Sequence, residues 1–203
     1  LSFFLWSSAP DRELLTLAED GKLRANLGQQ VERLLKDRRS IRFIQHFINT
    51  WLDLDNIKVM PPSDEFVNYY RDRLGPAMQH EVETFFGHVL RENLPPTELI
   101  DADYSFLNRE LAEHYGVSNV DGSELRKVSL SRNGRGGLLG QGAFLTASAN
   151  GVDTSPVVRG IYILEKLLGY TPPPPPPNIP AIEPDIRGVT SIREQLIKHR
   201  QDK

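Results

Sequence analysis

The chain has 203 residues, a net charge of −3 and no cysteine. The missing cysteines exclude disulfides, zinc–thiolate sites and thiol catalysis within it, and the small net charge does not favour nucleic acid as a partner. No apolar run reaches the roughly 18 residues that a membrane span requires, so we expect no membrane span. The chain opens on the apolar residues Leu1–Trp6, and we interpret it as a fragment of a larger protein.

Residues 1–120 have the pattern of a helical bundle unit. Ser8 is a suitable N-cap for a helix, with Asp11 three residues later in the capping-box position. Apolar residues then recur at helical spacing between Asp37 and Leu52, and large apolar residues spaced in this way are usually buried. We therefore expect the aromatic residues of this stretch to pack in the core.

A longer helical tract is predicted after Ser63. The Gly75–Pro76 pair interrupts it, because proline lacks an N–H and its ring clashes with the preceding turn. We expect either a kink or two abutting helices there. A short helix over residues 97–100 and another over residues 105–115, which a glycine would end, complete this unit.

A second unit is expected over residues 121–170. Leu125–Leu130 is its one strand candidate, and residues 134–151 are rich in glycine. A helix is predicted to begin with Ser155 as N-cap and Pro156 in the first turn, because these residue types favour those positions. We expect the glycine-rich segment and this helix to pack on the bundle.

The C-terminal part is predicted to be an extended arm followed by a helix. Pro172–Pro177 are six consecutive prolines, which favour polyproline II over residues 171–189. An amphipathic helix is expected over residues 190–203, leading to a further domain. The fold class is therefore mostly α: an irregular multi-helix bundle with at most a short β-hairpin and a C-terminal polyproline arm.

The glycines between residues 134 and 142 do not form a known phosphate-binding motif. No Gly-Lys-Ser/Thr follows them, and neither a G-x-G-x-x-G spacing nor a βαβ context is present. The favoured interpretation is that small residues allow a turn or helix to approach a neighbour closely, rather than that the segment binds an anion.

Signals for metal binding or hydrolysis are weak. Glu110 and His114 share a helix face, but H-E-x-x-H and G-x-S-x-G are both absent. The paired carboxylates Asp101 and Asp103 could serve as acids or bases, or simply as helix caps. We expect no metal site and no cofactor in this chain.

The best candidate for a ligand site is the start of the helix near residue 155. It combines free backbone amides, hydroxyls, a carboxylate and an arginine one turn further on, and such a place can hold an anion or a peptide carbonyl. In the alternative interpretation, Asp153 and Arg159 form an ion pair and Ser155 only caps the helix. The candidate ligand-binding residues are Arg135, Asn150, Asp153, Thr154, Ser155 and Arg159.

Five stretches resemble a bacterial family of unknown function that is abundant in planctomycetes. The resemblance covers nearly the whole chain and comprises two consecutive conserved units. The stretches are LSFFLWSSAP (1–10), DADYSFLNRELAEHYG (101–116), RGGLLGQGAFLTASA (135–149), TSPVVRG (154–160) and PPPPPPNIPAIEPDIR (172–187).

The resemblance implies a setting and no known activity. In that family the two units lie inside large exported proteins, and a c-type cytochrome segment follows shortly after a stretch like residues 192–200. We therefore expect an extracytoplasmic location and haem c in a downstream domain, since this chain holds no C-x-x-C-H. The expected function is a non-catalytic scaffold or binding module that positions the haem domain. The alternative is a catalytic domain, an oxidoreductase or a polysaccharide-active enzyme, that delivers electrons to it through a cleft joining Arg135, residues 150–155 and Asp101 or Asp103.

Overall fold

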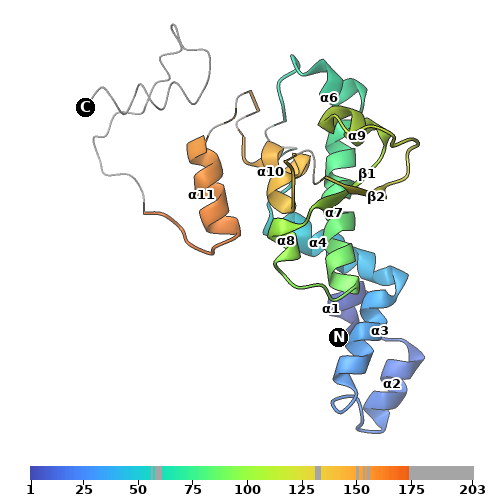
Figure 1. Ribbon diagram of the computed structural model, residues 1–203. Coiled ribbons are helices and arrows are strands. Elements are labelled where there is room, and N and C mark those ends of the chain that lie inside the picture. Colours follow the sequence, from blue (N-terminus) through green and yellow to red (C-terminus); the bar gives the residue numbers. More distant parts are fainter. Residues whose placement is uncertain are drawn as a thin grey trace, which may run out of the picture. The chain divides into compact units, whose positions relative to one another are not determined.

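The computed structural model of the chain describes residues 1–55, 57, 61–130, 134–149, 151, 152, 154 and 156–173. The predicted C-terminal helix and the polyproline arm after Pro173 lie outside these residues. The chain divides into two compact units, Leu1–Ala147 and Ser148–Lys203, whose elements are labelled in Figure 1. The described part is mostly helical with one two-stranded sheet, which confirms the predicted fold class. None of its helices combines the length and hydropathy needed to cross a bilayer.

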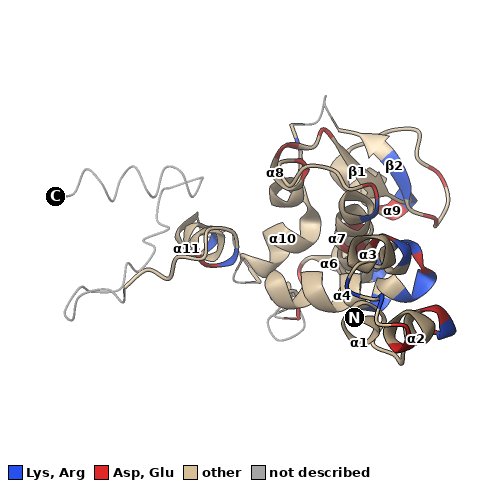
Figure 2. Ribbon diagram, turned by 90° about the horizontal axis from the view of Figure 1, so that it is seen from below, with Lys and Arg blue, Asp and Glu red and all other residues tan. Residues whose placement is uncertain are grey.

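Three short helices form the N-terminal part of the first unit: α1 (Ser2–Trp6), α2 (Arg12–Glu19) and α3 (Leu27–Lys36). Trp6 is fully buried in their core, and its indole N–H donates to the Leu34 carbonyl at 2.9 Å. The predicted Ser8 cap is wrong. Asp11 caps α2, because its carboxylate accepts a bond from a first-turn amide and is held by Arg33 of α3 at 2.6 Å. Figure 2 shows charges of both signs on α2 and α3.

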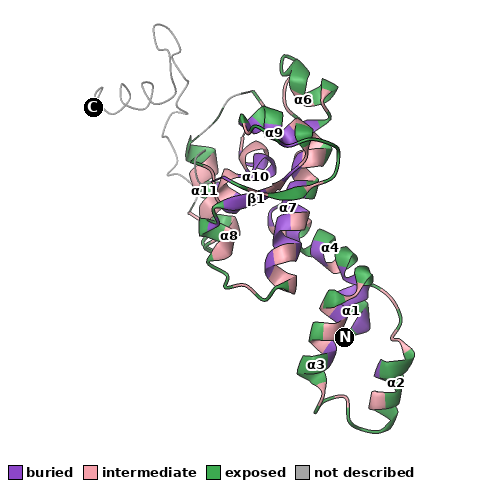
Figure 3. Ribbon diagram, turned by 45° about the vertical axis from the view of Figure 1, so that its right-hand side comes forward, coloured by how far each residue is buried: buried purple, intermediate pink, exposed green. Residues whose placement is uncertain are grey.

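The main core of this unit lies between α4 (Ile41–Trp51), which follows the 3₁₀ turn η1 (Arg38–Ser40), and the long α7 (Leu74–Arg91). Ile44 and Ile48 of α4 are fully buried, as their spacing predicts. Phe47 is 41 % exposed, so the expectation that every aromatic residue here is buried was wrong. Its ring stacks on Phe86 of α7 with centroids 5.3 Å apart, at the edge of the interface. Figure 3 shows buried residues along the length of α7.

The tract around Gly75–Pro76 consists of two abutting helices, α6 (Val67–Arg71) and α7. The break comes at Arg73, whose backbone is left-handed with φ 52°, and it therefore precedes the proline. Pro76 lies in the first turn of α7, where a missing N–H is tolerated because first-turn amides have no partner within the helix.

A short helix follows, and then a two-stranded sheet with a helix between its strands: α8 (Glu98–Asp101), β1 (Tyr104–Leu107), α9 (Arg109–Tyr115) and β2 (Arg126–Ser129). β1 and β2 pair antiparallel, with Tyr104 opposite Ser129. The predicted helix over residues 105–115 was wrong in its first part. Residues 105–107 belong to β1, because pairing with β2 overrides local helix propensity, and Asn108 then caps α9 by accepting from a backbone amide at 3.0 Å.

The glycine-rich segment forms the 3₁₀ turn η2 (Leu138–Gly140) and α10 (Gly142–Ala147), both within the first unit. The close-approach interpretation is confirmed. A Cβ on Gly142 would lie 2.7 Å from the Met78 side chain, and one on Gly136 would lie 2.6 Å from the Ala102 carbonyl oxygen. Gly137 has φ 53°, and a Cβ there would collide with the Ile100 carbonyl.

The described part of the second unit is dominated by α11 (Pro156–Lys166). Pro156 occupies its first turn, as the sequence predicts, whereas the predicted cap Ser155 lies outside the described residues. Gly169 then adopts φ 64° after the helix. The unit boundaries predicted from the sequence near residues 120 and 170 stay predictions.

Candidate functional site

A buried carboxylate lies at the centre of the first unit. Glu81 of α7 has no solvent exposure. One carboxylate oxygen accepts a hydrogen bond from the Ser105 hydroxyl of β1 at 2.6 Å, and the other accepts one from the Tyr115 hydroxyl of α9 at 2.6 Å. Both distances are in the short range typical of O–H···O⁻ bonds. Glu81 therefore joins three elements of the core.

The glycine-rich segment supplies the next ring of contacts. The Gln141 side-chain amide donates to the Ser105 hydroxyl at 3.2 Å, and the Gly142 backbone N–H donates to the Tyr115 hydroxyl at 2.7 Å. The Arg135 guanidinium lies over the Tyr115 ring, 4.1 Å from its centroid, and also donates to the Gly140 carbonyl at 2.7 Å. We call Glu81, Ser105, Tyr115, Arg135, Gln141 and Gly142 the Glu81 network.

The network changes the acid–base chemistry of its members. Burial raises the pKa of Glu81 to about 7, although the bonds from Ser105 and Tyr115 and the charge of Arg135 act in the opposite direction. Burial, together with the neighbouring Glu81 carboxylate, raises the pKa of Tyr115 far above its ordinary value. A carboxyl group with such a pKa can hold or release a proton near neutrality, yet no part of this one is open to a substrate.

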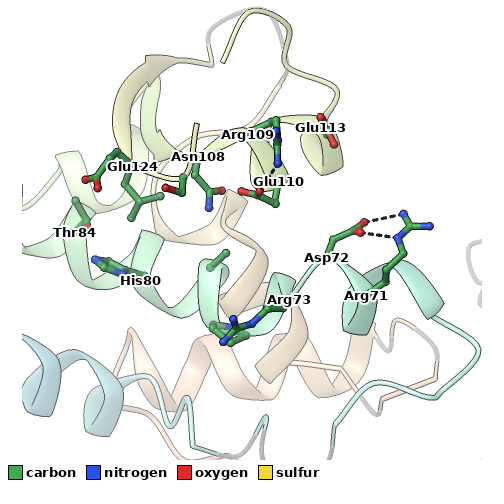
Figure 4. A pocket seen from close by; sticks show the side chains of 14 residues that line it. Arg71, Asp72, Arg73, His80, Thr84, Asn108, Arg109, Glu110, Glu113 and Glu124 are labelled. Atoms are coloured by element: carbon green, nitrogen blue, oxygen red, sulfur yellow. Dashed lines mark hydrogen bonds and ion pairs between the residues drawn. The ribbon is translucent and has the colours of Figure 1, made fainter. Parts of the chain in front are cut away.

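An open cleft of about 920 Å³ lies elsewhere on the same unit. In Figure 4 one wall comes from the end of α6 and from α7, and the other comes from α9 and the loop before β2. Its lining is polar apart from Pro76, Ala77 and Leu125. A cleft rich in carboxylates, guanidinium groups and an amide offers hydrogen bonds in both directions, as a polyhydroxylated ligand requires.

Two ion pairs lie in this cleft, and two of its basic side chains have no partner among the described residues. Arg71 pairs with Asp72 at 2.6 Å, and Arg109 pairs with Glu110 at 3.1 Å. Arg73 and His80 make no side-chain hydrogen bond or ion pair with any described residue. Within the described ranges, no group of three or more side chains is placed to hold a metal ion.

The candidate residues predicted from the sequence fall in the first unit, in the second unit or outside the described part. Arg135 lies in the first unit and belongs to the Glu81 network. In the second unit, Arg159 donates to the buried Ser148 hydroxyl at 3.1 Å, and Thr154 is exposed. Asn150, Asp153 and Ser155 lie outside the described residues, so the predicted Asp153–Arg159 pair stays a prediction.

Two further candidates take no part in the cleft. Asp101 and Asp103 are exposed and are not among its lining residues. Glu110 does line the cleft, but its helix partner His114 does not. Neither the Asp101/Asp103 pair nor the Glu110/His114 pair, both noted from the sequence, therefore identifies this cleft.

Sequence reasoning missed Glu81, although a signal was available. Met78, Val82 and Phe85 mark the buried face of α7, and Glu81 falls on that same face by its spacing. A carboxylate inside an apolar stripe is rarely buried without partners. The partners themselves, Ser105 and Tyr115, lie far away in sequence and could not be read from spacing.

Two family models match consecutive parts of the chain. Residues 1–117 match a model described as a protein of unknown function (DUF1592), named PSD4. Residues 135–203 match a second one, described as a protein of unknown function (DUF1588) and named PSCyt3. No curated protein and no solved structure matches the chain. The two matches confirm the resemblance to a family of two consecutive units, and the chain belongs to the DUF1592 family, with a DUF1588 segment following.

Proposed function

We propose that this chain is a non-catalytic scaffold or binding module of a larger exported protein. The observation that carries the proposal is the sealing of the Glu81 network. Its carboxyl group has a pKa near neutrality, and its arginine is the one predicted for a catalytic cleft, yet both serve contacts between α7, β1, α9 and α10. Groups that could do chemistry are thus used to hold elements together.

The partner that this scaffold positions is, in our proposal, a c-type cytochrome domain of the same polypeptide. The resemblance of residues 172–187 and the match of residues 135–203 to the DUF1588 family support this assignment. Haem c would be bound beyond the present chain, which has no cysteine for a thioether bond. Such a protein would work outside the cytoplasm, where c-type haem is attached.

The test uses the natural polypeptide with its continuation after Lys203, made in a host that matures c-type cytochromes. A spin label on Lys36→Cys, an exposed position of α3, reports its distance to the ferric haem by pulsed electron paramagnetic resonance. A scaffold predicts covalent haem and a narrow distance distribution, and Tyr115→Phe should broaden that distribution. Absence of covalent haem, or a broad distribution in the parent protein, contradicts the proposal.

The polar cleft supports a second candidate function, the binding of a short glycan. It belongs to the polysaccharide-active alternative. The cleft favours it because Arg73 and His80, which have no side-chain partner among the described residues, lie beside exposed carboxylates. Calorimetric titration with cellotriose, xylotriose and maltotriose tests it. Arg73→Ala and His80→Ala should each weaken binding about ten-fold, whereas Arg91→Ala, which lies outside the cleft, should leave it unchanged. No heat with any of the three sugars contradicts this second function.

A further inference from the structure

The two family matches are separated by a gap over residues 118–134, as two independent domains joined by a linker would be. The structure divides the chain differently. The first compact unit runs to Ala147, so residues 135–147 of the DUF1588 match lie inside the unit that holds the whole DUF1592 match.

The hydrogen bonds of this overlap cross from one family segment to the other. Gln141 and Gly142 belong to the second segment, and they donate to Ser105 and Tyr115 of the first at 3.2 Å and 2.7 Å. The Gly137 N–H donates to the Ala102 carbonyl at 3.1 Å. Both hydroxyls that donate to Glu81 therefore accept a hydrogen bond from the second segment.

The apolar contacts cross in the same way. Leu138, Ala143 and Phe144 are fully buried although they begin the second segment. α10 packs on α7, and η2 packs on α8. Removal of residues 135–147 would uncover the side chains that they pack against, such as the buried Met78 of α7, and would open the core around Glu81 to water.

The groove that receives this segment is narrow. Glycine is the only residue that fits at Gly136, Gly137 and Gly142 without a shift of neighbouring atoms, since a Cβ would meet the Ala102 and Ile100 carbonyls and the Met78 side chain. Gly134, directly before the groove, has a similar φ of 61° but faces open space. The close fit therefore begins where the second family match begins.

We infer that the DUF1592 segment and residues 135–147, the start of the DUF1588 segment, form one folding unit: the DUF1592 segment presents a groove whose occupant is the R-G-G-L-L-G-Q-G-A-F stretch of residues 135–144. The first segment is then not a self-standing domain. Its core is completed in cis by the segment that follows it, and the family boundary is not a structural boundary.

A cleavage experiment on the full chain tests this. A specific protease site is inserted beside Gly134, which is exposed, and the purified protein is cut there. We expect the two fragments to co-elute in size-exclusion chromatography without denaturant and to separate in urea. Separation of the cut fragments in native buffer, with the N-terminal fragment retaining the melting temperature of the uncut chain, would overturn the inference.

A pair of glycine variants shows whether the groove is responsible. Gly137→Ala and Gly134→Ala both place a side chain at positive φ, but Gly137, at φ 53° and ψ −168°, lies in a region that is essentially confined to glycine, and only its Cβ would collide with a carbonyl. Gly137→Ala should lower the melting temperature of the uncut chain by roughly 5 °C more than Gly134→Ala, and its cut fragments should separate. Equal behaviour of the two variants argues against the groove. If Gly137→Ala does not fold, co-elution of the cut parent chain still decides.

Discussion

The Glu81 carboxylate and the Tyr115 hydroxyl lie 2.6 Å apart in a part of the core that solvent does not reach. Each group depends on the other, because a buried polar atom without a partner costs about 1–3 kcal/mol and a buried charge costs more. The Gly142 backbone N–H donates a second hydrogen bond to the same Tyr115 hydroxyl. The pair therefore links the protonation of Glu81 in α7 to the packing of α10, which begins at Gly142.

Glu81→Gln should make stability less dependent on pH. The pKa of Glu81 is raised from 4.5 to about 7 in the folded protein, so the folded state binds the proton more tightly than the unfolded state. Stability is therefore full below the ordinary pKa and falls as the pH rises towards 7. The expected loss is about 3 kcal/mol, because one pKa unit corresponds to about 1.4 kcal/mol. Denaturant unfolding of parent and variant across this pH range measures it.

Glu113→Gln is the control for that experiment. Glu113 lies on the exposed side of α9, and its replacement removes one negative charge without touching the Glu81 network. The parent slope should persist in this variant. An equal flattening in both variants would show that overall charge, and not the buried carboxyl, sets the slope.

Tyr115→Phe should destabilise the protein by about 3 kcal/mol. The change leaves the Gly142 N–H and one Glu81 oxygen without their bonds, and each buried unpaired group costs about 1–3 kcal/mol. Tyr170→Phe is the control, because it removes the same hydroxyl from a side chain that is 54 % exposed. Urea unfolding compares the two, and a similar cost for both would contradict the role of Tyr115.

The helices were largely predictable from the sequence because their signals are local. Spacing of apolar residues marks α4 and α7, and Pro156 marks the start of α11. β1 was not predictable in this way, because it owes its conformation to β2 about twenty residues later. The early part of the predicted helix over residues 105–115 failed for that reason.

The candidate site was less predictable, because its partners meet only in three dimensions. Ser105 and Gln141 are 36 residues apart, and Tyr115 and Glu81 are 34 apart. Arg135 was selected from the sequence as a ligand-binding residue, but the structure places it on the Tyr115 ring. Charge and residue type selected this arginine, and tertiary packing sets the contacts that it makes.

Asp11→Asn and Asp11→Ala separate two contributions at the start of α2. Asparagine can keep the N-cap bond but loses the ion pair with Arg33, whereas alanine loses both. We expect costs of about 0.5–1 kcal/mol for Asn, as for other partly exposed pairs, and about 2 kcal/mol for Ala. Arg33 holds the pKa of Asp11 below its ordinary value, so the ion-pair contribution is present above that value and should disappear as the pH falls through the folded-state pKa. Equal losses for both variants at neutral pH would assign the whole effect to the ion pair.

Arg73→Gly should stabilise the protein while weakening the cleft. Arg73 has φ 52° before α7, a conformation that glycine adopts without the steric penalty of a side chain. We expect a gain of about 0.5–1 kcal/mol, or roughly 2–3 °C in calorimetry. Asn93→Gly, at φ 49° after the same helix, should gain less, because asparagine tolerates this region better than arginine.

Loss of the Arg73 guanidinium should also reduce any oligosaccharide affinity of the cleft about ten-fold, equivalent to about 1.4 kcal/mol. A variant that is more stable but binds as well as the parent would show that Arg73 contributes strain alone, and one that is less stable would show that its side chain holds the α6–α7 junction.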